Sequence, residues 1–289
     1  MILVTAGSDV LDNDNDLVLW RGKGKISNDE LLTHKGVDGI VCGDERYDRE
    51  MLAHFTPNLK VISRAGAGWD NIDQAAAQEL GIKVFRQEGA YAEAVADSTL
   101  AMILAFARRL ISLNNSMHKG EWKREKYPGV CLRETTIGII GLGHIGKQVL
   151  DRVKVFGGSY IVYHPSRPDK EWPLETLLKL SDFVTIHCAL VEETRHLIGE
   201  KELNQMKPNA YLINTSRGGL IDTTALVKAL SNGTIAGAGL DVFEEEPLPV
   251  EHVLRGLDNV ILTPHNAYWS PQERRAVVHR AVNVARSNL

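Results

Sequence analysis

A glycine-rich turn with the spacing Gly-x-Gly-x-x-Gly lies near the middle of the chain, within Thr136–Lys147 (TIGIIGLGHIGK). A run of β-branched apolar residues ends at Gly141, and the turn leads into a segment with helical periodicity. Gly141 allows a tight turn, Gly143 lets the backbone approach a pyrophosphate, and Gly146 lets the helix pack closely on the strand. The first amides of such a helix have no partner within it and can bind an anion. The sequence therefore predicts a βαβ unit with a dinucleotide site.

Polar side chains of three kinds follow later apolar runs in the same half of the chain. Arg217 and His265 each come just after a predicted strand, and an acidic stretch that ends at Glu246 follows another. A guanidinium binds a carboxylate through two parallel hydrogen bonds, which an ammonium group reproduces poorly. Histidine titrates near neutral pH, and a neighbouring carboxylate raises the pKa of an imidazole by about one unit. Because ligands of open parallel sheets bind beyond the carboxyl ends of the strands, these groups could bind an anion and exchange a proton there.

The elements that must position these groups form two alternating series of strands and helices. The β-rich runs of the first series are Ile2–Thr5, Leu17–Trp20, Gly39–Cys42, Lys60–Ser63 and Lys83–Phe85, with helical segments at Asn28–His34, Arg49–His54 and Asn71–Leu80. Those of the second series are Ile137–Ile140, Tyr160–Tyr163, Phe183–Ile186, Ala210–Asn214, Ile235–Leu240 and Val260–Leu262. This alternation predicts parallel sheets with helices on their faces, and six strands match the doubly wound dinucleotide-binding fold.

The chain of 289 residues is long enough for two domains. We expect two Rossmann-like or flavodoxin-like α/β domains with parallel sheets and a ligand cleft between them. Residues 1–97 and 267–289 are expected to form a discontinuous substrate domain, and residues 98–266 the dinucleotide-binding domain. The segment Tyr91–Lys119 has no Pro or Gly and predicts one long helix or two nearly collinear ones. The helical tail is expected to fold back onto the first domain.

Composition argues against several classes of partner and site. The net charge of −4 disfavours nucleic acid or an anionic membrane surface as the main partner. Cys42, Cys131 and Cys188 form no Cys-x-x-Cys pair, which favours reduced thiols. His187 directly precedes Cys188, a poor spacing for metal ligands, and no metal is expected. The first residues lack the features of a signal sequence, so we expect a cytoplasmic protein.

Six stretches of the chain resemble the D-isomer-specific 2-hydroxyacid dehydrogenases, in order and at plausible spacing. They are RAGAGWDNID (Arg64–Asp73), AEAVADSTLAMIL (Ala92–Leu104), GIIGLGHIG (Gly138–Gly146), LINTSRGGLID (Leu212–Asp222), GAGLDVFEEEP (Gly237–Pro247) and LTPH (Leu262–His265). The resemblance covers nearly the whole chain. It implies reversible hydride transfer between NAD(P)H and a 2-oxo or 2-hydroxy acid, and a homodimer formed through the nucleotide-binding domain.

The resemblance also implies roles for individual residues. Arg217 looks like the arginine that binds the substrate carboxylate and polarises the reacting carbonyl. His265 looks like the acid/base that protonates the carbonyl oxygen, and Glu246 like the partner that orients it. Asp241 resembles the acid that holds the nicotinamide carboxamide, and the loop Arg64–Gly68 resembles the substrate-carboxylate loop.

The same motifs give the full set of expected binding residues. The substrate residues are Arg64, Gly66, Ala67, Gly68, Trp69, Arg217 and His265. The cofactor residues are Gly141, Gly143, His144, Ile145, Gly146, His164, Ser166, Arg167, Cys188, Thr215 and Asp241. Glu244 and Glu245 are expected to be no more than an exposed charged loop. Trp69 is either ordinary packing or a wall of the substrate pocket.

One departure from the family pattern concerns the cofactor. Members that use NAD carry an acidic residue at the end of the second strand, where it holds the ribose hydroxyls. This chain has His164, Ser166 and Arg167 at that place, with no carboxylate before Asp169. An acid would repel a 2′-phosphate, whereas Arg and Ser would bind it. We therefore expect a preference for NADP over NAD.

The identity of the substrate stays open at this point. After His265 the chain reads NAYWS, which resembles the D-lactate and 2-hydroxyisocaproate branch, whereas RAGAGWDNID resembles the 3-phosphoglycerate branch. A D-3-phosphoglycerate dehydrogenase is one alternative to a general 2-oxo acid reductase, and Arg64 is the obvious extra cation for a phosphate. A non-enzymatic nucleotide-sensing relative is another, although intact Arg217, Glu246 and His265 weigh against it.

Overall fold

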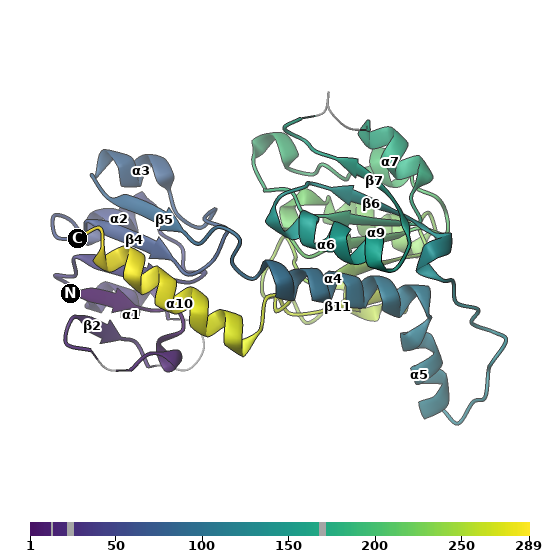
Figure 1. Cartoon of the computed structure of the whole chain (residues 1–289), viewed down its shortest axis with the longest axis horizontal. Helices are drawn as coiled ribbons and strands as arrows, with labels where there is room; N and C mark the ends of the chain where they lie inside the picture. Colours follow the sequence, from purple (N-terminus) through teal and green to yellow (C-terminus); the bar gives the residue numbers. More distant parts are fainter. Residues whose placement is uncertain (13, 22–25, 168–171) are drawn as a thin grey trace. The chain divides into compact units, whose positions relative to one another are not determined.

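The computed structural model describes residues 1–12, 14–21, 26–167 and 172–289. They form two compact units, one of residues 1–91 with 269–289 and one of residues 92–268 (Figure 1). The expected fold class of parallel α/β sheets in two units is confirmed. No helix within the described ranges is both long and apolar enough to cross a membrane.

The first unit is built on a five-stranded parallel sheet of order β2-β1-β3-β4-β5. Its strands are β1 (Ile2–Val4), β2 (Leu17–Leu19), β3 (Gly39–Cys42), β4 (Val61–Arg64) and β5 (Lys83–Arg86). Its short helices are α1 (Asn28–Thr33), α2 (Arg49–His54) and α3 (Gln74–Glu79). Each helix begins after a side-chain cap, supplied by Ser27, Asp48 and Asp73 in turn. Strands β1, β3 and β4 are wholly buried, which explains the apolar sequences of β1 and β3, whereas β4 ends in the buried Ser63 and Arg64.

The C-terminal helix α10 (Pro271–Arg286) belongs to this first unit and packs across β1, β3 and β4. Its buried stripe consists of Val277, Val278, Ala281, Val282 and Ala285. A Cβ added at Gly7 would lie 2.5 Å from a methyl carbon of Val278, so a glycine there lets the helix approach. Arg274 also pairs with Asp9 at 2.5 Å. The tail is thus held to the unit by both apolar packing and charge.

The second unit is built on a six-stranded parallel sheet of order β11-β10-β9-β8-β6-β7. Its strands are β6 (Thr136–Ile140), β7 (Ser159–Tyr163), β8 (Phe183–Ile186), β9 (Tyr211–Asn214), β10 (Gly237–Leu240) and β11 (Val260–Leu262). Its helices are α4 (Ala92–Ala107), α5 (Leu110–His118), α6 (His144–Val155), α7 (Leu174–Leu180), α8 (Glu200–Leu203) and α9 (Thr223–Ser231). Strand order reverses between β6 and β8, which is where doubly wound sheets bind ligands.

The borders of the units differ slightly from those expected. The chain passes from the first unit to the second between residues 91 and 92 and returns between 268 and 269, where we expected 97/98 and 266/267. Helix α4 begins at Ala92 and packs on α6 and β9. The whole helix therefore belongs to the second unit, whereas the expected border divided it.

The expectation of one long helix, or two nearly collinear ones, over Tyr91–Lys119 is wrong. Arg109 separates α4 from α5 with a left-handed backbone, φ 55°. Its guanidinium hydrogen bonds to the Tyr211 hydroxyl and lies over the ring of that residue, 5.5 Å from its centroid. Figure 1 shows α5 leaving the end of α4 at a steep angle. The local sequence contains no Gly or Pro that would indicate the break, and the partner of Arg109 lies 102 positions further along the chain.

Candidate active site

The glycine turn after β6 has the geometry that an anion-binding loop requires. Gly141 has φ 94°, and a Cβ there would lie 2.6 Å from the amide nitrogen of Cys188 at the end of β8. A Cβ at Gly146 would lie 2.0 Å from the carbonyl oxygen of Gly141, so the start of α6 touches the turn. A Cβ at Gly143 would meet nothing within 4 Å. The backbone at Gly143 therefore faces open space beside the first amides of α6, which fits a dinucleotide pyrophosphate.

The residues that flank this turn lie where the sequence suggested. His144 and Ile145 form the first turn of α6 with Gly146. Cys188 packs beneath Gly141, and burial raises the pKa of its thiol to about 11. Burial also lowers the pKa of the neighbouring His187 to about 3, so this imidazole is neutral. Both side chains thus form an uncharged floor under the turn.

The loop after β7 carries the residues expected at the cofactor ribose. The Ser166 hydroxyl lies 3.0 Å from His164 Nδ1, and the Arg167 amide donates to the His164 carbonyl at 2.9 Å. Ser166 and Arg167 are exposed. Asp169 lies outside the described residues. The described part of the loop therefore presents a hydroxyl and a guanidinium at this edge of the sheet.

Arg217 follows β9 in a turn that its neighbours hold on both sides. The Asn214 amide donates to the Arg217 carbonyl at 2.8 Å, and the Ser216 hydroxyl donates to the Cys188 carbonyl at 2.8 Å. A Cβ at Gly218 would lie 1.9 Å from the carbonyl carbon of Phe243, so the turn touches the loop after β10. This contact ties Arg217 to the acidic loop. The expected cofactor residue Thr215 is buried, with its hydroxyl 2.9 Å from that of Thr99 on α4.

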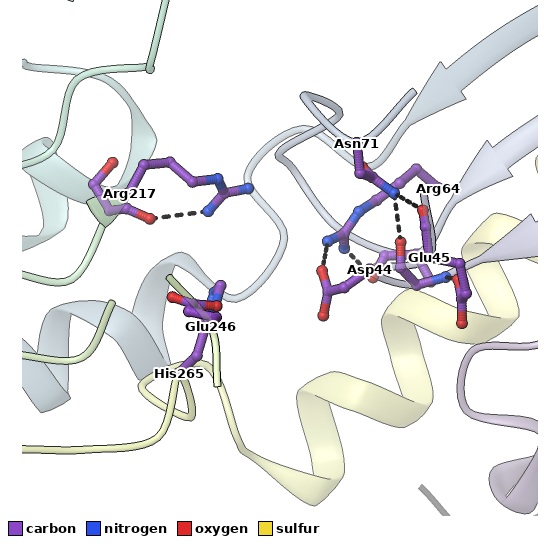
Figure 2. Close-up of polar contacts among 10 residues, drawn as sticks. Asp44, Glu45, Arg64, Asn71, Arg217, Glu246 and His265 are labelled. Carbon is purple, nitrogen blue, oxygen red and sulfur yellow. Dashed lines mark hydrogen bonds and ion pairs between the residues drawn. The ribbon is translucent and has the colours of Figure 1, made fainter. Parts of the chain in front are cut away.

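Glu246 and His265 form a carboxylate–imidazole pair, as expected from their motifs. His265 Nδ1 lies 2.7 Å from Glu246 Oε2 (Figure 2). The Phe243 amide donates to Glu246 Oε1 at 3.0 Å. Burial alone would raise the pKa of Glu246, but these hydrogen bonds and the charges of His265 and Arg217 outweigh it. The pKa of Glu246 is therefore below its usual range. Arg217 is thus close enough to act electrostatically on the pair.

Asp241 holds the segment that carries His265. Its carboxylate, in a residue only 1% exposed, accepts hydrogen bonds from the Thr263 hydroxyl at 2.5 Å and from the Asn266 and Ala267 amides at 3.0 Å each. Its carbonyl accepts from the His265 amide at 2.8 Å. His265 has a left-handed backbone, φ 51°, which costs a non-glycine residue energy unless its surroundings fix it. Asp241 supplies that support, while its expected contact to a carboxamide stays a prediction.

A second carboxylate–imidazole pair lies on the same acidic loop and was missed at the sequence level. Glu244 Oε1 lies 2.6 Å from His196 Nε2, and Glu244 Oε2 accepts from the Thr223 amide at the start of α9, at 3.0 Å. Burial would raise the pKa of Glu244, but these hydrogen bonds outweigh it and lower the pKa. Glu244 is exposed in the charged loop as expected, and it also has two partners that the sequence did not indicate. The only sequence clue was its position just after a strand, because His196 is far away along the chain.

The loop Arg64–Gly68 of the first unit is shaped by its own arginine. The Arg64 guanidinium hydrogen bonds to the Asp44 carboxylate and, through Nη1, to the Ala65 carbonyl at 3.1 Å (Figure 2). A Cβ at Gly66 would lie 1.7 Å from Nη1, so the guanidinium packs directly beneath this glycine. Arg64 is buried, whereas Ala67 and Gly68 are partly exposed. Direct contact between Arg64 and a substrate stays a prediction.

Trp69, next to that loop, lies against Arg86, whose guanidinium carbon is 4.5 Å from the ring centroid. The Trp69 side chain also lines a surface hollow of about 410 Å³ with residues of α3 and β5. Both contacts hold the indole on the first unit. They describe packing, and a role in the substrate pocket stays a prediction.

Comparisons with known proteins agree with this arrangement. Residues 100–267 match the family model described as the NAD binding domain of D-isomer specific 2-hydroxyacid dehydrogenases. The chain is 42% identical to the glyoxylate reductase of Thermococcus litoralis over 276 residues, an alignment that covers 90% of this chain and 83% of the relative. It is 44% identical over 261 residues to a D-3-phosphoglycerate dehydrogenase of Methanocaldococcus jannaschii, covering 87% of this chain and 50% of the relative. The crystal structure of a glyoxylate reductase from Paecilomyes thermophila is similar with a TM-score of 0.85 at 30% identity, covering 99% of this chain and 94% of that one. The chain therefore belongs to the D-isomer-specific 2-hydroxyacid dehydrogenase family.

Proposed function

We propose that this protein reduces a small 2-oxo acid to the D-2-hydroxy acid with a nicotinamide cofactor, in a reversible reaction. The observation that carries the proposal is the Glu246–His265 pair beside Arg217, in the unit whose residues 100–267 match the NAD binding domain of the family. Glyoxylate reductases among its relatives support a 2-oxo acid as substrate. The second unit would bind the cofactor and the first the substrate.

Each of the three side chains has a defined task in this proposal. The cofactor, when bound, supplies the hydride. Arg217 binds the substrate carboxylate and polarises the carbonyl through its planar, two-pronged donor set. His265 uses Nδ1 to bind Glu246, which leaves Nε2 as the ring nitrogen that delivers a proton to the carbonyl oxygen. Glu246 stabilises the protonated imidazole and fixes its orientation.

Steady-state kinetics with a panel of 2-oxo acids test this function. The panel is glyoxylate, hydroxypyruvate, pyruvate, branched 2-oxo acids and 3-phosphohydroxypyruvate, each with NADH and with NADPH. We expect turnover of at least one unphosphorylated acid, with the D-isomer as product. Absence of turnover across the panel, together with intact nucleotide binding, would favour the non-enzymatic nucleotide-sensing alternative.

For the cofactor we propose a preference for NADPH. The support is the exposed Ser166 and Arg167 after β7, at the place where an acid would otherwise hold the ribose. We expect a higher kcat/KM with NADPH, and a loss of that preference in the Arg167→Ala variant. Lys147→Ala, which removes an exposed cation on α6 of the same unit, is the matched control. A strong preference of the unmodified enzyme for NADH would refute this proposal.

We also propose a homodimer formed through the second unit, in a cytoplasmic protein. Exposed apolar side chains gather on α5 and the segment that follows it, namely Leu110, Ile111, Met117 and Trp122, the last 77% exposed. Sedimentation of a Leu110→Glu/Met117→Glu variant is expected to show a monomer. Val250→Glu, at another exposed position of the same unit, should leave the dimer intact. A monomeric unmodified protein would contradict the dimer, and cell fractionation tests the location.

A further inference from the structure

The most informative group outside the proposed acid–base site is the ion pair between Arg64 and Asp44 in the first unit (Figure 2). The Arg64 side chain is only 11% exposed, while that of Asp44 is 53% exposed. One terminal nitrogen of the guanidinium binds Asp44 and the other binds the Ala65 carbonyl. The cation of the loop Arg64–Gly68 is thus covered and neutralised by a carboxylate that itself faces solvent.

The segment that presents Asp44 is held in place from both sides. The Asn71 side-chain amide donates to the carbonyls of Gly43 at 3.1 Å and of Glu45 at 2.6 Å. The Gly43 amide in turn donates to Glu45 Oε2 at 2.7 Å. Asp44 therefore lies between two residues that are both bonded to Asn71, three positions after the loop Arg64–Gly68. This arrangement makes the ion pair a built part of the fold.

Two other arginines of the first unit also have carboxylate partners. Arg86, which lies over Trp69, pairs with Glu88 at 2.8 Å. Arg46 approaches Asp48 at 3.7 Å. In the described part of the first unit, these pairs leave the loop without an excess of positive charge. Recognition by the loop would then depend on its backbone amides.

A phosphorylated substrate would need more positive charge than this loop offers. A phosphate monoester adds a charge of about −1.5 to −2 at neutral pH, beyond the carboxylate that every 2-oxo acid carries. Asp44 would repel that charge, and Arg64 could meet it only by giving up a partly buried ion pair. A 2-oxo acid without a second anionic group meets neither obstacle.

We propose that Asp44 determines the substrate class of this enzyme by neutralising Arg64, so that the site selects 2-oxo acids that carry no phosphate. This inference rests on the proposed function and on the assignment of the Arg64–Gly68 loop to substrate binding. Removing the Asp44 charge should expose Arg64 to an incoming phosphate. The loop would then acquire the extra cation that a phosphoglycerate dehydrogenase needs.

Hydroxypyruvate and 3-phosphohydroxypyruvate are a matched pair of substrates that differ only in the phosphate. For the unmodified enzyme we expect kcat/KM to favour hydroxypyruvate by roughly a hundredfold or more. In Asp44→Asn we expect kcat/KM for the phosphorylated substrate to rise roughly tenfold, with little change for hydroxypyruvate. Asp29→Asn removes one negative charge from an exposed position on α1 of the same unit, and it should leave the ratio unchanged. The gain should vanish in an Asp44→Asn/Arg64→Gln variant.

Calorimetric binding of 3-phosphoglycerate and of D-glycerate gives a second readout that does not depend on turnover. Tighter binding of 3-phosphoglycerate to Asp44→Asn than to the unmodified protein, without a matching gain for D-glycerate, supports the inference. Equal binding by both proteins overturns it, as does an unmodified enzyme that prefers the phosphorylated substrate. Failure to turn over either substrate would instead count against the proposed function, while the calorimetry still decides the role of Asp44.

Discussion

The second unit contains two carboxylate–imidazole pairs with similar internal geometry. Glu246 with His265 and Glu244 with His196 are separated by 2.7 and 2.6 Å, and both glutamates come from one short loop. Both histidines have φ 51°. Their surroundings differ: Arg217 lies near the first pair, whereas the second is bonded to the backbone at the start of α9. The neighbours, and not the pair, thus distinguish His265, which we propose as the proton donor, from His196.

The largest difference in kcat is expected between variants of the two histidines. His265→Ala should lower kcat by at least about a hundredfold, because the variant has no general acid at the carbonyl oxygen. His196→Ala is the matched control and should stay within a few-fold of the unmodified enzyme. Stopped-flow or steady-state kinetics with a good substrate would measure both. Comparable losses in the two variants would contradict the distinction between the pairs.

Arg217→Lys should remove the guanidinium that distinguishes the surroundings of the Glu246–His265 pair. Lysine keeps the charge but loses the two parallel donors, so we expect kcat to fall and KM to rise together, by roughly 10- to 100-fold in kcat/KM. Arg195→Lys, on the loop next to the other pair, serves as control. A fully active Arg217→Lys enzyme would rule out the proposed role of its guanidinium.

Glu246→Gln should move the pH profile as well as lower the rate. The His265 contact helps to lower the pKa of Glu246, and by reciprocity the carboxylate favours the protonated imidazole. Without the Glu246 carboxylate, His265 should lose its proton at a lower pH. The alkaline limb of the kcat profile for 2-oxo acid reduction should therefore shift to lower pH, with a rate loss of roughly tenfold at neutral pH. Glu244→Gln should leave the profile in place. An unshifted profile in Glu246→Gln would show that the pair does not set the protonation state of the site.

The smallest effect on activity, but a measurable one on stability, is expected for Glu244→Gln. The variant weakens the bonds to the Thr223 amide and to His196, and we expect a loss of about 1 kcal/mol in the free energy of unfolding at pH 7. Because the pKa of Glu244 is lowered by folding, this contribution is complete above its unfolded pKa and disappears as the pH falls through the folded one. Urea denaturation at pH 7 and in acid would show the difference shrinking. A difference that grows in acid would refute this account.

The parts of the molecule that depend on local sequence were predictable. Apolar runs gave the strands, with β3, β8 and β11 matching the expected bounds, and strand ends pointed to Arg217, Glu246 and His265. The glycine spacing also predicted the turn after β6, where a side chain at Gly141 or Gly146 would collide with neighbouring backbone.

Contacts between residues far apart in the chain were not predictable. Arg109, at the bend between α4 and α5, contacts Tyr211, and the second pair joins Glu244 to a histidine 48 positions away. Likewise, Arg64 looked like an available cation until the structure showed Asp44 against it. A single sequence gives residue types at strand ends, but it does not tell which partner each will meet across the loops.

The contact at Gly218 limits how closely the turn that carries Arg217 and the acidic loop after β10 can be rearranged. No side chain separates Gly218 from the Phe243 carbonyl, so the turn that carries Arg217 lies directly against the main chain of the acidic loop. Even a methyl group at position 218 would push the two loops apart. The spacing of these two loops is therefore set by main-chain contact, and any change in it requires the backbone to move on at least one side.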